Sequence, residues 1–185
     1  MSEPAQLVVR VPVSESGYRA FRQAAPPEPS AELGWDAWLG SQRYYGPPIT
    51  FERLRNELCR YEEPSIDACL RAWARADDSG RARDRYDATR GEWRYLLVDF
   101  SENYGDYARV LNVLQHLARF KDGSEPGYAL VFNHVWEQGA ISALVRIDAG
   151  RARFVEHDTD EARAFARDAA DAVERATGFW GFLGR

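Results

Sequence analysis

The residues best suited to chemistry stand together at 156–161, where the sequence reads EHDTDE. Carboxylates beside an imidazole could bind a divalent metal or carry out acid–base catalysis. Their spacing fits neither a helical nor a loop metal motif, and no calcium-loop glycine follows. Asp158 and Glu161 instead stand in the N-cap to N3 relation of a capping box. We therefore predict a helix cap with a solvated acidic surface, with no metal, no cofactor and no catalytic residue.

The other reactive residue types follow no catalytic motif. GxSxG, HExxH, GxGxxG and a Walker loop are absent from the sequence. Cys59 and Cys69 form no CxxC motif and have no neighbouring histidine, which favours buried thiols. A site assembled only in space leaves no local trace. An enzyme, either a hydrolase or a transferase, therefore stays an alternative, with His134, Glu156 and His157 as its first candidates.

Charge and composition narrow the class of partner. The chain of 185 residues has a net charge of −5, and most of the excess negative charge falls in residues 91–185. This balance disfavours binding to a phosphate backbone and favours a partner with a basic surface, so we expect no nucleic-acid partner. The amino terminus lacks the pattern of a signal peptide, and no apolar run is long enough for a membrane span. We expect a cytoplasmic protein that does not enter a membrane.

The first half of the chain predicts one strand followed by helices. Residues 7–13 alternate weakly and contain Pro12, which cannot donate to a strand ladder, so we expect an edge strand. Ser14 or Ser16 can cap a helix, and further helices are expected from Thr50 and after Pro64. Residues 77–92 have few apolar side chains and predict a solvated loop of mixed charge.

The second half predicts a sheet. Residues 93–100 are apolar on both alternating faces, as in a central strand, and residues 128–136, 141–148 and 151–155 predict an antiparallel meander. Between them, Ser101 with Glu102 should begin a helix. The buried face of that helix is expected to consist of Tyr107, Val110, Leu111, Leu114 and Leu117. Its polar face is expected to consist of Arg109, Asn112, His116 and Arg119.

These patterns together predict an α+β fold with a mostly antiparallel sheet packed against helices. The sheet has an N-terminal edge strand, a central strand at 93–100 and the meander at 128–155. Residues 1–185 are expected to form a single domain, with a helical portion at about 14–77 and a sheet-rich portion at 93–178.

The sequence also resembles a known family. Residues 93–139, together with the TrpLeuGly at 38–40, resemble bacterial polymorphic-toxin immunity proteins of α/β type. The resemblance covers about half of the chain and carries over no catalytic residue. It implies a non-enzymatic cytoplasmic antidote that binds a cognate toxin or effector; the sequence leaves the oligomeric state open.

Charged residues give fast electrostatic capture of a partner, and aromatic residues give slow release. The candidate charged contacts are Glu102, Asp106, Glu137, Asp158, Asp160 and Glu161. The candidate aromatic anchors are Trp38, Tyr45 and Trp136. Aromatic residues such as those at 35–45 are usually core residues, and a patch that anchors a partner is the alternative. A third alternative is a structural or adaptor subunit that docks through the aromatic tail at 179–183.

Overall fold

The structure, a computed structural model, describes residues 5–42, 48–132, 141–155 and 159–177. These residues form a six-stranded antiparallel sheet in the order β2-β3-β1-β4-β5-β6. The strands are β1 (Ala5–Pro12), β2 (Arg83–Asp87), β3 (Glu92–Ser101), β4 (Gly127–Phe132), β5 (Ile141–Asp148) and β6 (Arg151–Phe154). The predicted α+β fold with an antiparallel sheet is therefore confirmed.

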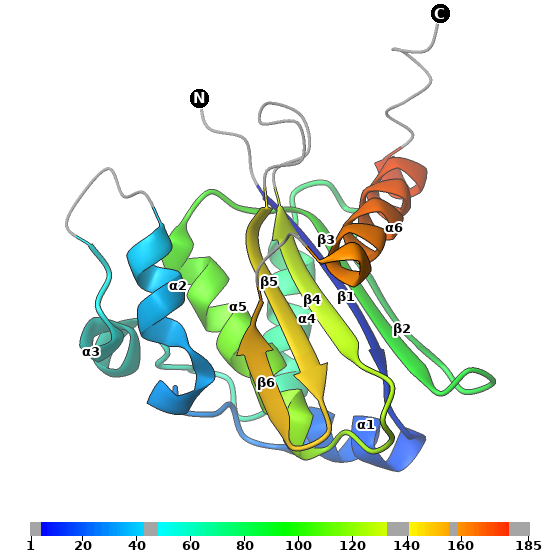
Figure 1. The fold of residues 1–185 in the computed structure, drawn as a ribbon, viewed down its shortest axis with the longest axis horizontal. Coiled ribbons are helices and arrows are strands. Elements are labelled where there is room, and N and C mark those ends of the chain that lie inside the picture. Colours follow the sequence, from blue (N-terminus) through cyan, green and yellow to red (C-terminus); the bar gives the residue numbers. More distant parts are fainter. Residues whose placement is uncertain (1–4, 43–47, 133–140, 156–158, 178–185) are drawn as a thin grey trace, which may run out of the picture.

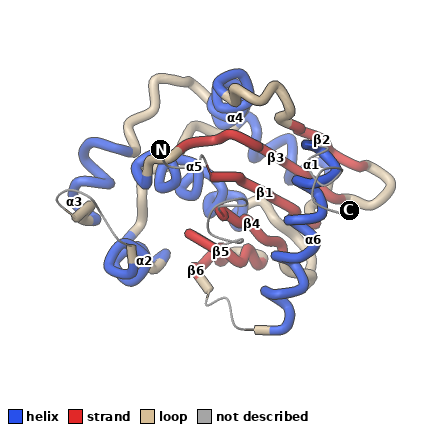
Figure 2. The backbone as a smooth tube through the Cα atoms, turned by 90° about the horizontal axis from the view of Figure 1, so that it is seen from above, coloured by secondary structure: helices blue, strands red, loops and turns tan. Residues whose placement is uncertain are grey.

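Helices cover both faces of the sheet (Figures 1 and 2). They are α1 (Glu15–Gln23), α2 (Trp35–Ser41), α3 (Phe51–Arg53), α4 (Ile66–Ala76), α5 (Tyr104–His116) and α6 (Asp160–Thr177). Short turns η1 (Ala31–Leu33), η2 (Leu54–Leu58) and η3 (Leu117–Arg119) join them. Figure 2 shows α6 on one side of the sheet and α4 and α5 on the other, and α1 packs on the side of α5 through Phe21. We call these two faces the α6 side and the α5 side.

The prediction of an N-terminal edge strand is wrong. β1 lies inside the sheet, with β3 on one side and β4 on the other. Pro12 is compatible with this position because it is the last residue of β1, and the pairing with β4 has already ended at Arg10. A proline at the end of a strand costs no ladder bond on the side where no partner continues. The true edges in the described part of the chain are β2 and β6.

The prediction of a loop across residues 77–92 is also wrong in part, because β2 forms there and pairs with β3. The charged residues of this segment are typical of a solvated loop, but an edge strand is also solvated on one face and commonly carries charge. Asp77, at the start of this segment, is buried and accepts a 2.6 Å hydrogen bond from the backbone N–H of Val98. The segment is thus fastened to the sheet.

Three helix starts agree with the sequence and one differs. The Ser14 side chain caps α1, as predicted, and α4 begins after Pro64, as predicted, with the Ser65 side chain as its cap. α5 begins at Tyr104 rather than at 101, because Asn103 supplies the cap. The helix predicted from Thr50 does start there, and the Thr50 side chain caps α3. It is shorter than predicted, because α3 passes into the π-helical turn η2 and ends before Tyr61.

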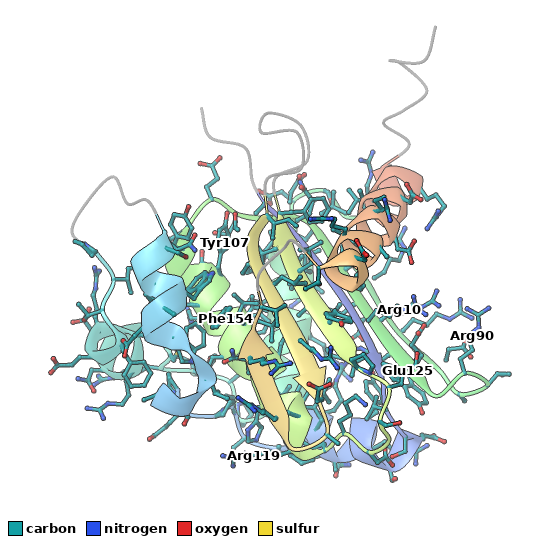
Figure 3. All side chains as sticks on the ribbon, viewed as in Figure 1. Arg10, Arg90, Tyr107, Arg119, Glu125 and Phe154 are labelled. Carbon is teal, nitrogen blue, oxygen red and sulfur yellow. The ribbon has the colours of Figure 1, made fainter. Side chains whose placement is uncertain are left out.

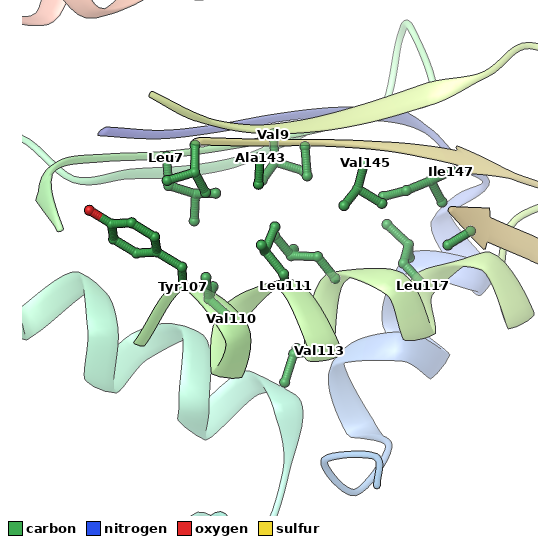
Figure 4. Close-up of a cluster of buried hydrophobic side chains, with 14 of the residues drawn as sticks. Leu7, Val9, Tyr107, Val110, Leu111, Val113, Leu117, Ala143, Val145 and Ile147 are labelled. Carbon is green, nitrogen blue, oxygen red and sulfur yellow. The ribbon is translucent and has the colours of Figure 1, made fainter. Parts of the chain in front are cut away.

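Two apolar clusters hold the layers together. On the α5 side, Leu7 and Val9 of β1 face Leu111 of α5, and the cluster extends along the sheet to Ile147 (Figure 4). On the α6 side, a smaller cluster joins Val8, Leu130 and Leu144 to α6 through residues such as Phe165. Because successive residues of a strand point to opposite faces, β1 contributes to both clusters. The sheet is therefore the shared middle layer.

An ion network fastens α1 to α4 and to β2. The Arg22 guanidinium donates through Nε to Asp67 Oδ1 at 2.6 Å and through Nη1 to Asp84 Oδ2 at 2.5 Å. Asp84 also accepts a 2.9 Å hydrogen bond from the indole N–H of Trp93. The Arg22 side chain is only 11% exposed. Removing it would deprive Asp84 of its guanidinium partner in a partly dry site and leave Asp67 with Arg71 alone, whose Nε lies 2.9 Å from Asp67 Oδ2.

We expect Arg22→Ala to lower the free energy of unfolding by about 2 kcal/mol, because both aspartates would lose a charged donor. Urea denaturation monitored by circular dichroism measures the change. The matched control is Arg19→Ala on the same helix. Arg19 pairs with Glu15 at an exposed site, so its removal should cost less than about 0.5 kcal/mol. Equal losses in the two variants would contradict the structural role given to Arg22.

Candidate functional site

Those of the predicted contact residues that the structure describes do not gather in one place. Glu102 is exposed just before α5, and Asp106 lies in the first turn of α5, where it accepts a 2.7 Å hydrogen bond from Ser101 Oγ. Asp160 begins α6 on the other side of the sheet and is fully exposed. Glu137, Asp158, Tyr45 and Trp136 lie outside the described residues, as does the Glu161 side chain. They remain predictions.

Trp38 is a core residue in this structure, not a surface anchor. Its ring is 6% exposed and stacks on Phe154 of β6 with ring centroids 5.2 Å apart. Its indole N–H donates to the backbone carbonyl of Ser142 at 2.9 Å. Trp35 packs edge-on against both rings. The alternative of core packing therefore holds for Trp35 and Trp38, because α2 must bury an apolar face against β6.

The polar face expected on α5 is only partly exposed: Arg119 is exposed, Arg109 and His116 are half-buried, and Asn112 is buried, contrary to the prediction. Asn112 is 1% exposed, and its amide donates to the carbonyl of Pro27 at 2.7 Å and to the Tyr61 hydroxyl at 3.1 Å. The Tyr61 hydroxyl in turn donates to the carbonyl of Arg109 at 2.8 Å. A second layer of chain thus covers α5, and the buried amide supplies a donor to a backbone carbonyl that lies outside any ladder.

The two cysteines lack the features of a catalytic thiol. Burial raises the pKa of Cys59 to about 11. Burial, reinforced by the nearby Glu63 carboxylate, raises the pKa of Cys69 to about 12. A reactive cysteine needs the opposite shift, because the thiolate is the nucleophile. The prediction of buried thiols is confirmed, since both residues are buried and neither forms a disulfide.

The described histidine, His116, is half-buried against Phe120, with ring centroids 5.4 Å apart. Burial and the positive charge of Arg119 lower its pKa, so it is neutral at physiological pH. No group of three or more His, Cys, Asp or Glu side chains within the described ranges could hold a metal ion. His134, Glu156 and His157 lie outside these ranges, so the enzyme alternative that rests on them stays untested.

The structure reveals a feature that the sequence analysis missed. On the α6 side, one residue from each strand stands directly opposite its neighbour: Arg85, Arg94, Arg10, Tyr128, Arg146 and Arg153. We call the five arginines of this line, Arg85, Arg94, Arg10, Arg146 and Arg153, the arginine row. At the usual strand spacing of about 4.8 Å, the row spans about 24 Å. Like charges directly opposite one another are unfavourable in a sheet, so this alignment needs compensation.

The row is the middle one of three chemical bands on this face. Above it, the apolar residues Leu96, Val8, Leu130 and Leu144 align across β3, β1, β4 and β5 and belong to the cluster under α6. Below it, acidic residues include Asp87, Glu92 and Asp148. In Figure 3, Arg10 and Glu125 lie at this lower part of the sheet, below α6. α6 covers the apolar band and leaves most of the charged bands uncovered.

Glu92 compensates the two central arginines. Its side chain is 6% exposed and accepts hydrogen bonds from Arg10 Nε at 2.6 Å and Arg94 Nε at 2.5 Å. Burial opposes ionisation of Glu92, but the two arginine hydrogen bonds outweigh it and lower the pKa of the carboxyl. At the other arm of the row, Arg146 Nε lies 3.0 Å from each oxygen of Asp148. Carboxylates on the band below therefore hold guanidiniums in place.

The guanidiniums remain accessible despite these pairs. The side chains of Arg10 and Arg94 are 45% and 49% exposed, and Arg85 and Arg153 are exposed on the two edge strands. A hollow of about 230 Å³ opens beside the centre of the row. It is lined by Arg10, Pro12, Glu125, Pro126, Tyr128, Ala164, Phe165 and Asp168. The row thus combines fixed geometry with solvent-facing donors, as a preorganised binding surface requires.

We expect Glu92→Gln to lower the free energy of unfolding by about 2 kcal/mol at pH 7, because Arg10 and Arg94 would lose their shared counter-charge. A lowered native pKa stabilises the fold above the ordinary value of 4.5, and this contribution disappears as the pH falls through the native pKa. Urea denaturation at several pH values should therefore show the two proteins converging below about pH 4.5. A difference that grows on acidification would contradict this assignment.

We expect both thiols of the folded protein to react with iodoacetamide at pH 7.5 at least about a hundredfold more slowly than in urea, because burial raises their pKa and limits access. Mass spectrometry after timed quenching measures each cysteine separately. Rapid alkylation of Cys59 or Cys69 in the native protein would contradict their description as buried thiols of raised pKa.

In the part of the chain that the structure describes, no helix is both long and apolar enough to cross a membrane. Comparison with known proteins identifies no relative: no family model, no curated protein and no solved structure matches this chain.

Proposed function

We propose that this protein is a non-enzymatic binding protein that neutralises a cognate bacterial toxin or effector by covering part of its surface. The observation that carries the proposal is the banded face on the α6 side, where the arginine row stands on a rigid sheet. Rigid placement matters because a partner then loses little affinity to the ordering of flexible side chains. The resemblance to polymorphic-toxin immunity proteins supports the same function and a cytoplasmic location.

The surface chemistry is suited to protein recognition. Arginine is enriched at the energetic centres of protein interfaces, where its planar fork pairs with carboxylates. The net charge of −5 gives a long-range attraction for a basic partner, which speeds encounter. Glu102, Asp106 and Asp160 stay candidate contacts for such basic patches. We therefore propose a partner whose net charge is positive and whose contact surface carries both signs.

The proposal is tested with the toxin encoded next to the gene for this protein. Purified protein and toxin, mixed at low salt, should elute as one complex in size-exclusion chromatography, and the activity of the toxin should fall in proportion to the amount of complex. A toxin from an unrelated gene pair is the control for specificity. Separate elution together with full toxin activity would contradict the proposed function.

A further inference from the structure

Arginines on the edge strands alone would have a simple explanation. Charged residues on β2 and β6 discourage the pairing of two sheet edges from different molecules. This explanation covers Arg85 and Arg153 but not Arg10, Arg94 and Arg146, which lie on strands with a neighbour on both sides. Interior strands expose no unpaired ladder. The continuous row therefore requires another reason.

The repulsion within the row is only partly offset. Arg94 stands opposite both Arg85 and Arg10, and Arg146 stands opposite Arg153. The nearby carboxylates are Glu92, Asp148, Asp87, Glu125 and Asp168, of which Asp168 of α6 lies 3.9 Å from Arg10 Nη1. Glu92 serves two guanidiniums at once. Guanidinium groups at both ends of the row therefore remain available to carboxylates of another molecule.

From this geometry we infer that the arginine row binds an acidic segment of the partner protein. The segment lies across the strands, with its carboxylates on the guanidiniums. This inference rests on the proposed function, because it names the charge of the segment by which that partner makes contact. An extended segment of about eight residues spans the row at about 3.3 Å per residue. A guanidinium has five N–H donors, and those of Arg85 and Arg153 are exposed on the edge strands, where a carboxylate can reach them.

The acidic residues below the arginine row favour a peptide with carboxylates over the phosphates of a nucleic acid. A polynucleotide would bring a line of phosphates against Asp87, Asp148 and Glu125 as well as against the arginines. Binding to single strands also relies on exposed aromatic rings that stack on bases. Tyr128, which stands between Arg10 and Arg146 on β4, is 8% exposed and packs against Phe165, with ring centroids 5.1 Å apart. A single acidic segment fits the narrow cationic line better.

The test compares two double variants of equal charge. The row variant is Arg85→Glu with Arg153→Glu, and the control variant is Arg55→Glu with Arg119→Glu. All four arginines are exposed, but Arg55 in η2 and Arg119 in η3 lie away from the α6 side. Urea denaturation should show that both variants are folded. The probes are a fluorescent oligoglutamate of about eight residues and a single-stranded oligonucleotide of similar length.

Fluorescence anisotropy at about 50 mM salt should detect oligoglutamate binding to the unmodified protein. The row variant should bind it at least about tenfold more weakly, and the control variant should change the affinity less than about twofold. Equal losses in both variants, tighter binding of the oligonucleotide, or no oligoglutamate binding would overturn the inference.

Repeating the comparison with the neighbouring toxin separates this inference from the proposed function. A toxin complex weakened by the row variant alone supports both. A toxin complex that forms equally well with both variants refutes the inference and leaves the proposed function standing. If no toxin complex forms while oligoglutamate still binds the row, the proposed function fails and the preference of the row for carboxylates stands.

Discussion

The pairing of β1 with β3 on one side and β4 on the other is the constraint on which the rest of the structure depends. Leu7 and Val9 point into the cluster on the α5 side, whereas Val8 points toward α6. A shift by one residue would exchange the two faces and carry Arg10 into the core. A slip by one residue is therefore excluded, and the observed register joins the first residues of the chain to its second half.

The same register creates the arginine row. Once β1, β3 and β4 are aligned by their apolar residues, Arg10 and Arg94 must stand opposite each other. The resulting repulsion is tolerated because Glu92 is held between them in a partly dry site. Local arrangements that stability alone does not favour are common at sites of function. The row is the clearest such arrangement among the described residues.

Buried polar groups elsewhere attach peripheral segments to the core. Arg22 ties α1 to α4 and β2, and Asn112 holds the proline-rich connector against α5. These interactions attach peripheral segments that have too little apolar surface to pack by themselves. Among the described residues, the sheet is thereby covered on the α5 side by two layers of chain and on the α6 side by α6. This asymmetry leaves the side chains of Arg10 and Arg94 on the α6 side partly exposed to solvent.

Local patterns in the sequence were sufficient for the α+β class, the strand pattern of the second half, and the helix starts at Ser14 and Thr50, because alternation and capping depend on residues close in the chain. They could not show that β1 is an interior strand, that charged residues 83–87 form an edge strand, or that Asn112 is buried, since each depends on distant neighbours. Every strand except β4 displays an outward arginine in the sequence, yet only the pairing of the strands aligns these arginines into one row, because cross-strand register is a property of the assembled sheet.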